Sequence, residues 1–336
     1  MKKTIVFCLI FSVLAANAFA QLSFSGSMYA GVQLEIPFVE GEDVMVNTLH
    51  REEGAPTFNF TATASRPGFG ARLNTTFQYA ETDPLTLNGI YGWANFLDNS
   101  LRFTVGRIND AVWVGNLDSN SVIEFDVITG FRLDYTTPIP GLSVGAAFPA
   151  ADHDVELFAK KVMLGAMFMH PMFNATLAYD MGNNTRALFT FNYFGIPNLE
   201  LGIQAFGRNL SSWDCPQHSG SLELTQRVSY RVIRPLTVSM LFGQVFSGVP
   251  DRDILLSFSP RAQYRINPAI TAFLDIEITT PDYFSSPDTM TTRVRPSVEF
   301  SLGGPAVFYA QYELFMGHFE SQSFHRFSIG IDIRAF

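Results

Sequence analysis

Residue types that carry chemistry are few in this sequence, and their spacing matches no catalytic or metal-binding motif. Asp152-His153-Asp154 is a trio of ligand types, but three adjacent polar residues are typical of a solvated loop. Ser211 and Ser212 share a polar stretch with His218, but a nucleophile and a histidine without an orienting acid do not make a triad. No H-E-x-x-H sequence and no cysteine pair beyond residue 20 occurs. The sequence therefore predicts no enzyme activity, no metal site and no cofactor.

Most remaining polar side chains recur at every second position, which is the period of an extended strand. In "QLSFSGSMYAGVQLEI", residues 21–36, Phe24 and Leu34 belong to an apolar parity, whereas Ser23 and Glu35 belong to a polar one. This strand is long, because strands in soluble domains average about 5–6 residues. The pattern predicts a strand with one apolar face and one polar face.

The same two-sided pattern returns along the whole chain in segments of about ten residues, the length that a membrane-spanning strand requires. Tight turns join alternate segments at 66–69, 98–100, 137–141, 170–172, 195–198, 233–235, 266–269 and 302–305. Longer polar stretches lie between them at 39–55, 81–88, 110–127, 149–156, 181–185, 207–220, 247–252, 279–291 and 316–323. The count predicts a meander of eighteen strands. Pro260 and Pro296 interrupt two of them, which leaves sixteen strands open.

A sheet in lipid must close, because hydrocarbon offers no partner for the backbone groups of an edge strand. The apolar parity would then face lipid, and the polar parity would face a lumen too wide for side chains to fill. The predicted fold class is all-β, a transmembrane antiparallel up-and-down β-barrel of about 16–18 strands. No stretch beyond residue 20 has the roughly 18 apolar residues of a membrane-spanning helix.

The first twenty residues have the features of a cleavable secretory signal peptide. They contain two lysines, an apolar run from Thr4 to Leu14 and the ending Ala18-Phe19-Ala20. Residues 21–336 are then expected to form a single barrel domain in the bacterial outer membrane. Without Lys2 and Lys3 the formal net charge changes from −9 to −11, which argues against a nucleic-acid partner. Cys215 is the single cysteine that remains, so no intrachain disulfide is possible.

The segment "YGWANFLDNSLRFTVGRIND", residues 91–110, resembles the fourth and fifth strands of bacterial general porins. There a short turn leads into a strand that ends in a Gly-Arg pair. Phe336 is similar to the terminal aromatic of outer-membrane barrels, which is part of their assembly signal. The architecture resembles that family over 21–336, whereas the similarity of individual residues is confined to 101–110 and the last strand. General porins have sixteen strands, and Phe336 falls on the polar parity of the last strand, so both features depart from the family pattern.

The resemblance implies that the loop after the fifth strand, residues 108–130, folds into the lumen and narrows it. Its carboxylates would face arginines of the barrel wall; the predicted constriction consists of Asp110, Asp118, Glu124, Asp126, Arg72, Arg102 and Arg132. Opposed acidic and basic walls would favour polar solutes over apolar ones. The alternative is that these charges are solvated groups of a wet interior.

The predicted function is therefore a porin, a water-filled channel for passive diffusion of small polar solutes and ions. Near balance of the wall charges predicts weak ion selectivity, and the acidic loops favour cations slightly. An adhesin or surface-binding barrel that uses loops such as 39–55 and 207–220 is the alternative, and a barrel hydrolase is a further one. The expected partners are outer-membrane lipid, small hydrophilic solutes and, by resemblance, further copies of the chain in a trimer.

Overall fold

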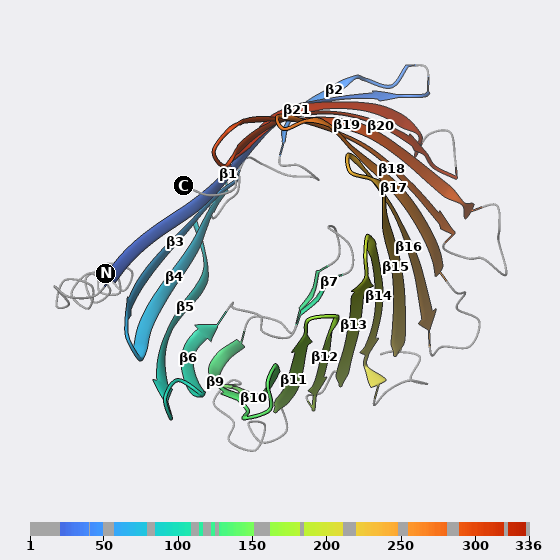
Figure 1. Cartoon of the computed structure of the whole chain (residues 1–336). Coiled ribbons are helices and arrows are strands. Elements are labelled where there is room, and N and C mark those ends of the chain that lie inside the picture. The colour runs from blue at the N-terminus through green and yellow to red at the C-terminus, as the bar shows by residue number, and fades with distance from the viewer. Residues whose placement is uncertain are drawn as a thin grey trace.

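The computed structural model is a ring of antiparallel strands around an open centre (Figure 1). It describes residues 21–39, 41–49, 57–78, 85–108, 114–116, 122–124, 128–150, 162–181, 185–210, 220–247, 255–280, 289–318 and 322–333.

The strands follow the chain in order around the ring. They are β1 (Gln21–Pro37), β2 (Met45–Leu49), β3 (Thr57–Arg66), β4 (Phe69–Gln78), β5 (Leu85–Phe96), β6 (Leu101–Ile108), β7 (Val114–Asn116), β8 (Val122–Glu124), β9 (Ile128–Thr136), β10 (Leu142–Pro149), β11 (Met163–His170), β12 (Phe173–Asp180), β13 (Arg186–Ile196), β14 (Leu199–Arg208), β15 (Ser221–Ile233), β16 (Leu236–Ser247), β17 (Leu255–Asn267), β18 (Ile270–Thr280), β19 (Thr291–Gly303), β20 (Ala306–Met316) and β21 (Phe324–Ile333).

The barrel closes between its first and last strands. Strand β1 pairs with β21 from Met28↔Ile333 to Pro37↔Phe324, and with β3 from Gln21↔Ser65 to Tyr29↔Thr57. Strand β2 continues the β3 side of β1 at Gly31–Glu35, whereas β7 and β8 pair only with each other. The remaining eighteen strands form one closed antiparallel barrel, so the prediction of an all-β barrel is confirmed at its upper strand number.

Every predicted tight turn joins two strands that are hydrogen-bonded to each other. The first lies between β3 and β4, and the last lies between β19 and β20. Gly68 has a φ of 87° in the first turn, a backbone conformation that residues with a Cβ rarely adopt. The long connections all join strand ends at the opposite end of the barrel, so the predicted alternation of short and long connections is confirmed.

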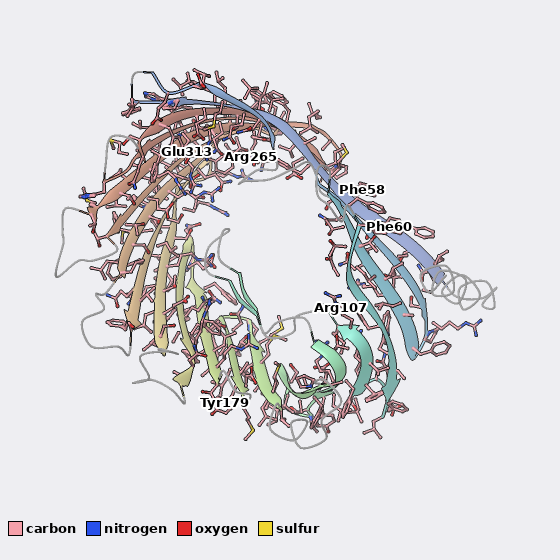
Figure 2. The ribbon with its side chains drawn as sticks, turned by 180° about the vertical axis from the view of Figure 1, so that it is seen from behind. Phe58, Phe60, Arg107, Tyr179, Arg265 and Glu313 are labelled. Carbon is pink, nitrogen blue, oxygen red and sulfur yellow. The ribbon has the colours of Figure 1, made fainter. Side chains whose placement is uncertain are left out.

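The two faces of the sheet are reversed relative to a soluble protein. Large apolar side chains such as Phe24, Leu177 and Ile203 are exposed on the outside, whereas Gln204 and Glu313 on the inside are buried. Figure 2 shows Glu313 and Arg265 on the inner side of the ring and Tyr179 on the outer side. An apolar exterior around a polar interior is the arrangement that a lipid environment stabilises.

The two prolines inside strands do not end those strands. Pro260 in β17 and Pro296 in β19 each lack the N–H that the neighbouring strand would accept. Pairing of β17 with β18 passes from Phe258↔Ile278 to Arg261↔Asp275, and pairing of β19 with β20 passes from Val294↔Leu314 to Ser297↔Gln311. Because the register is the same on both sides of each gap, the ladder tolerates the loss and eighteen strands are kept.

A tyrosine fills the space of two glycines at the closing strands. Gly31 of β1 faces Gly330 of β21, and a Cβ on Gly330 would lie 2.5 Å from the Tyr309 ring of β20. Tyr309 also stacks on Tyr29, with ring centroids 5.4 Å apart. Covering strand glycines with an aromatic ring is a known way to stabilise a curved sheet.

Several sequence predictions fall outside the described residues. They include the signal peptide at 1–20, Cys215 and the terminal Phe336. Within the described part of the chain, no helix is long and apolar enough to cross a membrane.

Candidate pore lining and constriction

The inner wall carries a series of ion pairs on β17–β21 and β1. We call it the ion-pair belt; its members are Glu35, Arg326, Glu313, Arg293, Glu277, Arg295, Asp275 and Arg261. The register of these strands brings acids and arginines opposite one another, for example Asp275↔Arg295 and Glu313↔Arg326. The belt therefore follows directly from alternation within strands and from pairing between them.

Two arginines at the centre of the belt each bind two carboxylates. Arg326 Nη2 lies 2.7 Å from Glu35 Oε2, and its Nη1 lies 3.5 Å from Glu313 Oε2. Arg293 Nε lies 2.9 Å from the other Glu313 oxygen, and its Nη1 lies 3.4 Å from Glu277 Oε2. Glu313 is thus shared by two arginines: Arg326 donates a hydrogen bond to Oε2, whereas Arg293 forms an ion pair with Oε1 that lacks hydrogen-bond geometry.

The ends of the belt are also paired. Arg295 Nη2 lies 3.7 Å from Glu277 Oε2, and Arg261 Nε lies 3.2 Å from Asp275 Oδ1. Acids and arginines are equal in number, so the belt adds almost no net charge to the lumen. This agrees with the near balance of wall charge predicted from the sequence.

Aromatic rings hold several belt guanidiniums in place. Arg261 lies 4.9 Å from the Phe273 ring centroid, and Arg293 lies 5.3 Å from that of Phe315. Arg326 lies 4.5 Å from the ring centroid of Phe324. Stacking adds cation–π attraction and restricts the arginine side chains, so this side of the lumen is a fixed surface.

Further ion pairs continue around the other strands. Arg132 Nε lies 2.8 Å from Asp134 Oδ2 on β9, and Arg186 Nη2 on β13 lies 2.9 Å from Asp180 Oδ2 on β12. Arg227 on β15 also pairs with Glu200 on β14, and Arg208 with Glu223. The predicted constriction residue Arg132 is therefore bound to its own strand, two residues away.

The other two predicted arginines lie on strands without acids. Arg72 Nη1 donates to the Tyr91 hydroxyl at 3.2 Å, and its Nε donates to Thr63 Oγ1 at 3.3 Å. Arg102 lies 4.7 Å from the Trp93 ring centroid. Asp134 faces Arg102 across the β6–β9 ladder but binds Arg132 instead. Arg72 and Arg102 therefore share one sector of the inner wall, whereas Arg132 belongs to the adjoining one.

The loop after β6 contributes a hairpin inside the barrel. Strands β7 and β8 pair from Val114↔Glu124 to Asn116↔Val122, and β7 lies against β13 of the barrel wall. Figure 1 shows β7 inside the ring of strands. This segment therefore reduces the open cross-section on the side of β13.

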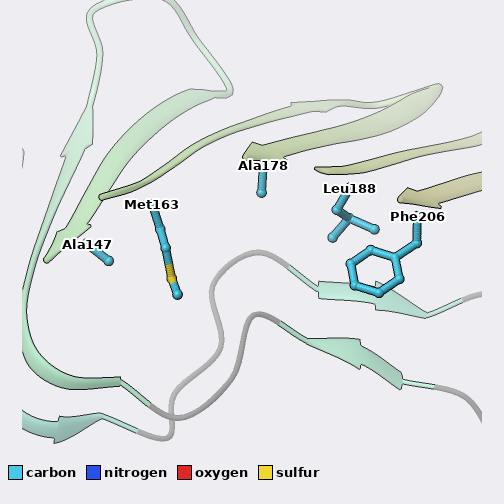
Figure 3. Packing of buried hydrophobic residues seen from close by; sticks show 5 residues of the cluster. All are labelled: Ala147, Met163, Ala178, Leu188 and Phe206. Atoms are coloured by element: carbon cyan, nitrogen blue, oxygen red, sulfur yellow. The ribbon is translucent and has the colours of Figure 1, made fainter. Parts of the chain in front are cut away.

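An apolar patch on the inner wall lies under this hairpin. Its members are Ala147, Met163, Ala178, Leu188 and Phe206 on β10–β14, all buried. They share the inner face, because Ala147 pairs with Arg132 and Met163 pairs with Asp180. Figure 3 shows Leu188 and Phe206 projecting from the wall towards the hairpin. The hairpin backbone therefore lies over an apolar part of the inner wall, where burial of these side chains is favourable.

Sequence reasoning missed this inner apolar patch. The alternation predicts that the apolar parity faces lipid, whereas these residues lie on the opposite, polar parity. The signal that could have found them is Leu188 opposite Phe206, two large apolar residues on a face that is otherwise hydrophilic. Three of the predicted loop acids, Asp110, Asp118 and Asp126, lie outside the described residues. Glu124 ends β8, where only its backbone is described.

No group of histidine, cysteine and acidic side chains that could hold a metal ion occurs among the described residues. The trio at 152–154 and the serine–histidine stretch at 211–218 both lie outside that part of the chain. That both are solvated loops rather than sites stays a prediction.

The closed barrel, its apolar exterior and its charged interior define the fold of outer-membrane porin-like β-barrels. No protein-family model and no curated protein sequence matches the chain.

Solved structures of bacterial outer-membrane channels do match it. Acinetobacter baumannii OccAB3 is similar with a TM-score of 0.65 and 10% identity, over 94% of this chain and 99% of that one. A BenF-like porin from Pseudomonas fluorescens Pf-5 is similar with a TM-score of 0.62 and 10% identity, over 93% and 98%. A variant of the Rh. blastica porin has a TM-score of 0.53 and 13% identity, over 94% and 100%. These identities show a shared fold and no more.

Proposed function

We propose that this protein is an outer-membrane porin, a water-filled channel for passive diffusion of small hydrophilic solutes and ions. The observation that carries the proposal is that the barrel is closed and that its inner face is lined by arginines, carboxylates and hydroxyl side chains. An interior of this polarity favours water, because buried charges without water or partners are costly. The porin-like fold of the solved structures supports the same reading.

The narrowest part of the proposed channel lies between the β7–β8 hairpin and the wall formed by β17–β21, β1 and β3–β6. In this proposal the acids of the hairpin loop face the arginines of β4 and β6, Arg72 and Arg102, across the opening. The same proposal includes a signal peptide at 1–20 and a mature chain that starts at Gln21. It also includes an assembly signal to which Phe336 belongs, and a trimeric state. We propose no enzymatic role for the barrel.

Swelling of liposomes that contain refolded 21–336 tests the diffusion function. Solutes that enter through an open pore cause swelling, and the rate should fall steadily as the mass of a neutral sugar rises. Liposomes with the same protein denatured before reconstitution are the control. Equal rates in the two preparations, with the barrel shown to be inserted, would refute a diffusion channel and favour a surface-binding role for the long loops.

A further inference from the structure

Methionines gather on one strand of the inner wall. Four of the eleven methionines in the sequence lie within residues 163–172, on β11 and in the tight turn that follows it. Met163, Met167 and Met169 share the parity that faces the lumen, since Met167 pairs with the inward residue Thr176 of β12. Apolar side chains are otherwise placed mainly on the outer face, so a row of thioethers on the inner face needs its own explanation.

Two of these thioethers lie where a bound ion could reach them. Met163 is buried, whereas Met167 is partly exposed and Met169 is 59% exposed at the end of the barrel that carries the tight turns. Side chains two residues apart on one strand face are separated by roughly 7 Å along the strand. Because methionine is unbranched and has three rotatable bonds, the sulfur atoms of Met167 and Met169 can converge on one ion between them.

The wall around these two methionines carries no positive charge. Strands β10, β11 and β12 contain no lysine and no arginine. Asn174 faces Met169 across the ladder, and its Oδ1 accepts a hydrogen bond from Asn192 Nδ2 at 3.0 Å. Asn192 Oδ1 is buried and accepts no hydrogen bond from the described part of the chain. A cation at Met169 would therefore meet neutral groups and a free acceptor nearby, and no repelling charge on its own or the adjoining strands.

The neighbouring histidine does not belong to this cluster. His170 lies on the outer parity of β11, where its ring stacks on Phe168 and packs against Phe173, with centroids 6.4 and 4.9 Å apart. Its Nδ1 accepts a hydrogen bond from the Met172 backbone N–H at 3.3 Å. The inner face of β11 at Met167 and Met169 therefore offers thioethers without imidazole, thiolate or carboxylate.

We propose that Met167 and Met169 form a binding site for a soft monovalent metal ion of the Cu(I) class. Thioether ligands select Cu(I), whereas Zn²⁺ takes thiolate, imidazole and carboxylate ligands and Mg²⁺ and Ca²⁺ take oxygen ligands. Two sulfur donors satisfy such an ion, which accepts a linear arrangement. The site goes beyond the diffusion of hydrophilic solutes and does not depend on it, because Met169 is exposed at the end of the barrel.

Equilibrium dialysis with silver(I) tests the site. Silver(I) shares the preference of Cu(I) for sulfur and needs no reductant. The protein is refolded 21–336 in detergent with the substitution Cys215→Ser, because a thiol would bind silver more strongly than a thioether. In chloride-free buffer with silver nitrate we expect about one tightly held silver ion per chain, and an excess of zinc(II) should not displace it.

Matched methionine variants locate the bound ion. The double variant Met167→Leu and Met169→Leu removes both sulfur atoms and nearly conserves side-chain volume, so it should raise the Kd for silver at least tenfold. The control is Met28→Leu with Met240→Leu, two methionines that are 37% and 43% exposed on the outer face. This control should leave the Kd for silver unchanged.

Three results would overturn the proposal: no retained silver, displacement of silver by zinc(II), or an equal loss of affinity in the inner and outer double variants. If the inner double variant does not refold, Met169→Leu alone makes the same test, since that side chain is more than half exposed. Binding is measured without conduction, so a barrel that proves closed to solutes would leave this result standing, and a conducting barrel without silver binding would refute the metal site alone.

Discussion

Substitution Leu188→Asn should release the β7–β8 hairpin from the barrel wall. Leu188 has no exposed surface, and it lies in the apolar patch that the hairpin covers. Burial of a leucine side chain stabilises by about 1.5–3 kcal/mol, and an amide buried without a partner costs about 1–3 kcal/mol. The change therefore weakens hairpin docking by roughly 3 kcal/mol or more, which is about a hundredfold in the docking equilibrium.

The cost should appear in the hairpin rather than in the barrel. Leu188 is held on both sides by ladder pairing, with Ala178 on β12 and with Phe206 on β14, whereas β7 and β8 pair only with each other. In planar bilayers we expect the variant to show larger open-state current noise and a larger mean conductance than the unchanged protein.

The matched control is Ile203→Asn on β14. Ile203 is 49% exposed on the outer face, so its amide would not contact the hairpin and the conductance should stay the same. A Leu188→Asn barrel that inserts normally and keeps both the conductance and the noise of the unchanged protein would refute hydrophobic anchoring of the hairpin.

Two further substitutions test the wall and the closing strands. Glu313→Gln removes the carboxylate shared by Arg326 and Arg293, so the reversal potential in a salt gradient should shift towards anions; the same charge change in a turn, Asp98→Asn, should shift it less. An equal shift in both variants would contradict a role for the belt in selectivity. Gly330→Ala places a Cβ 2.5 Å from Tyr309 and should lower the free energy of unfolding by about 1–3 kcal/mol in urea titrations. In the control Gly92→Ala, the new Cβ meets its nearest atom at 3.4 Å, so the free energy of unfolding should fall much less. Equal losses of stability in the two variants would show that the close contact with Tyr309 does not cause the loss in Gly330→Ala.

The fold could be predicted because its physical signal is local. A strand that faces lipid on one side and water on the other must alternate at every second residue, and a tight turn must carry residues such as Gly68 that accept its backbone angles. Even Pro260 and Pro296, which left the strand number open, interrupt the ladder on one side only and keep its register.

The interior was less predictable because its signals are not local. Which carboxylate binds which arginine depends on register between strands, as the pairing of Arg326 with Glu35 across the closing strands shows. The inner apolar patch could not be found from alternation, because Leu188 and Phe206 are apolar residues on the polar parity. They lie on a part of the wall that strand β7, from a loop far away in the chain, approaches.

The three wall arginines illustrate the limit of the predicted constriction. The sequence grouped Arg72, Arg102 and Arg132 by parity alone. The structure separates them, because Arg132 binds Asp134 whereas Arg72 contacts Tyr91 and Arg102 contacts Trp93. Charge and parity alone therefore did not reveal the neighbours of each arginine.

Single-channel conductance of refolded 21–336 in a planar bilayer under a salt gradient tests the central claim most directly. A water-filled barrel predicts stable current steps and a small reversal potential, since the wall charges nearly cancel. A bilayer that stays sealed, although the protein is shown to be inserted and folded, would contradict a diffusion channel.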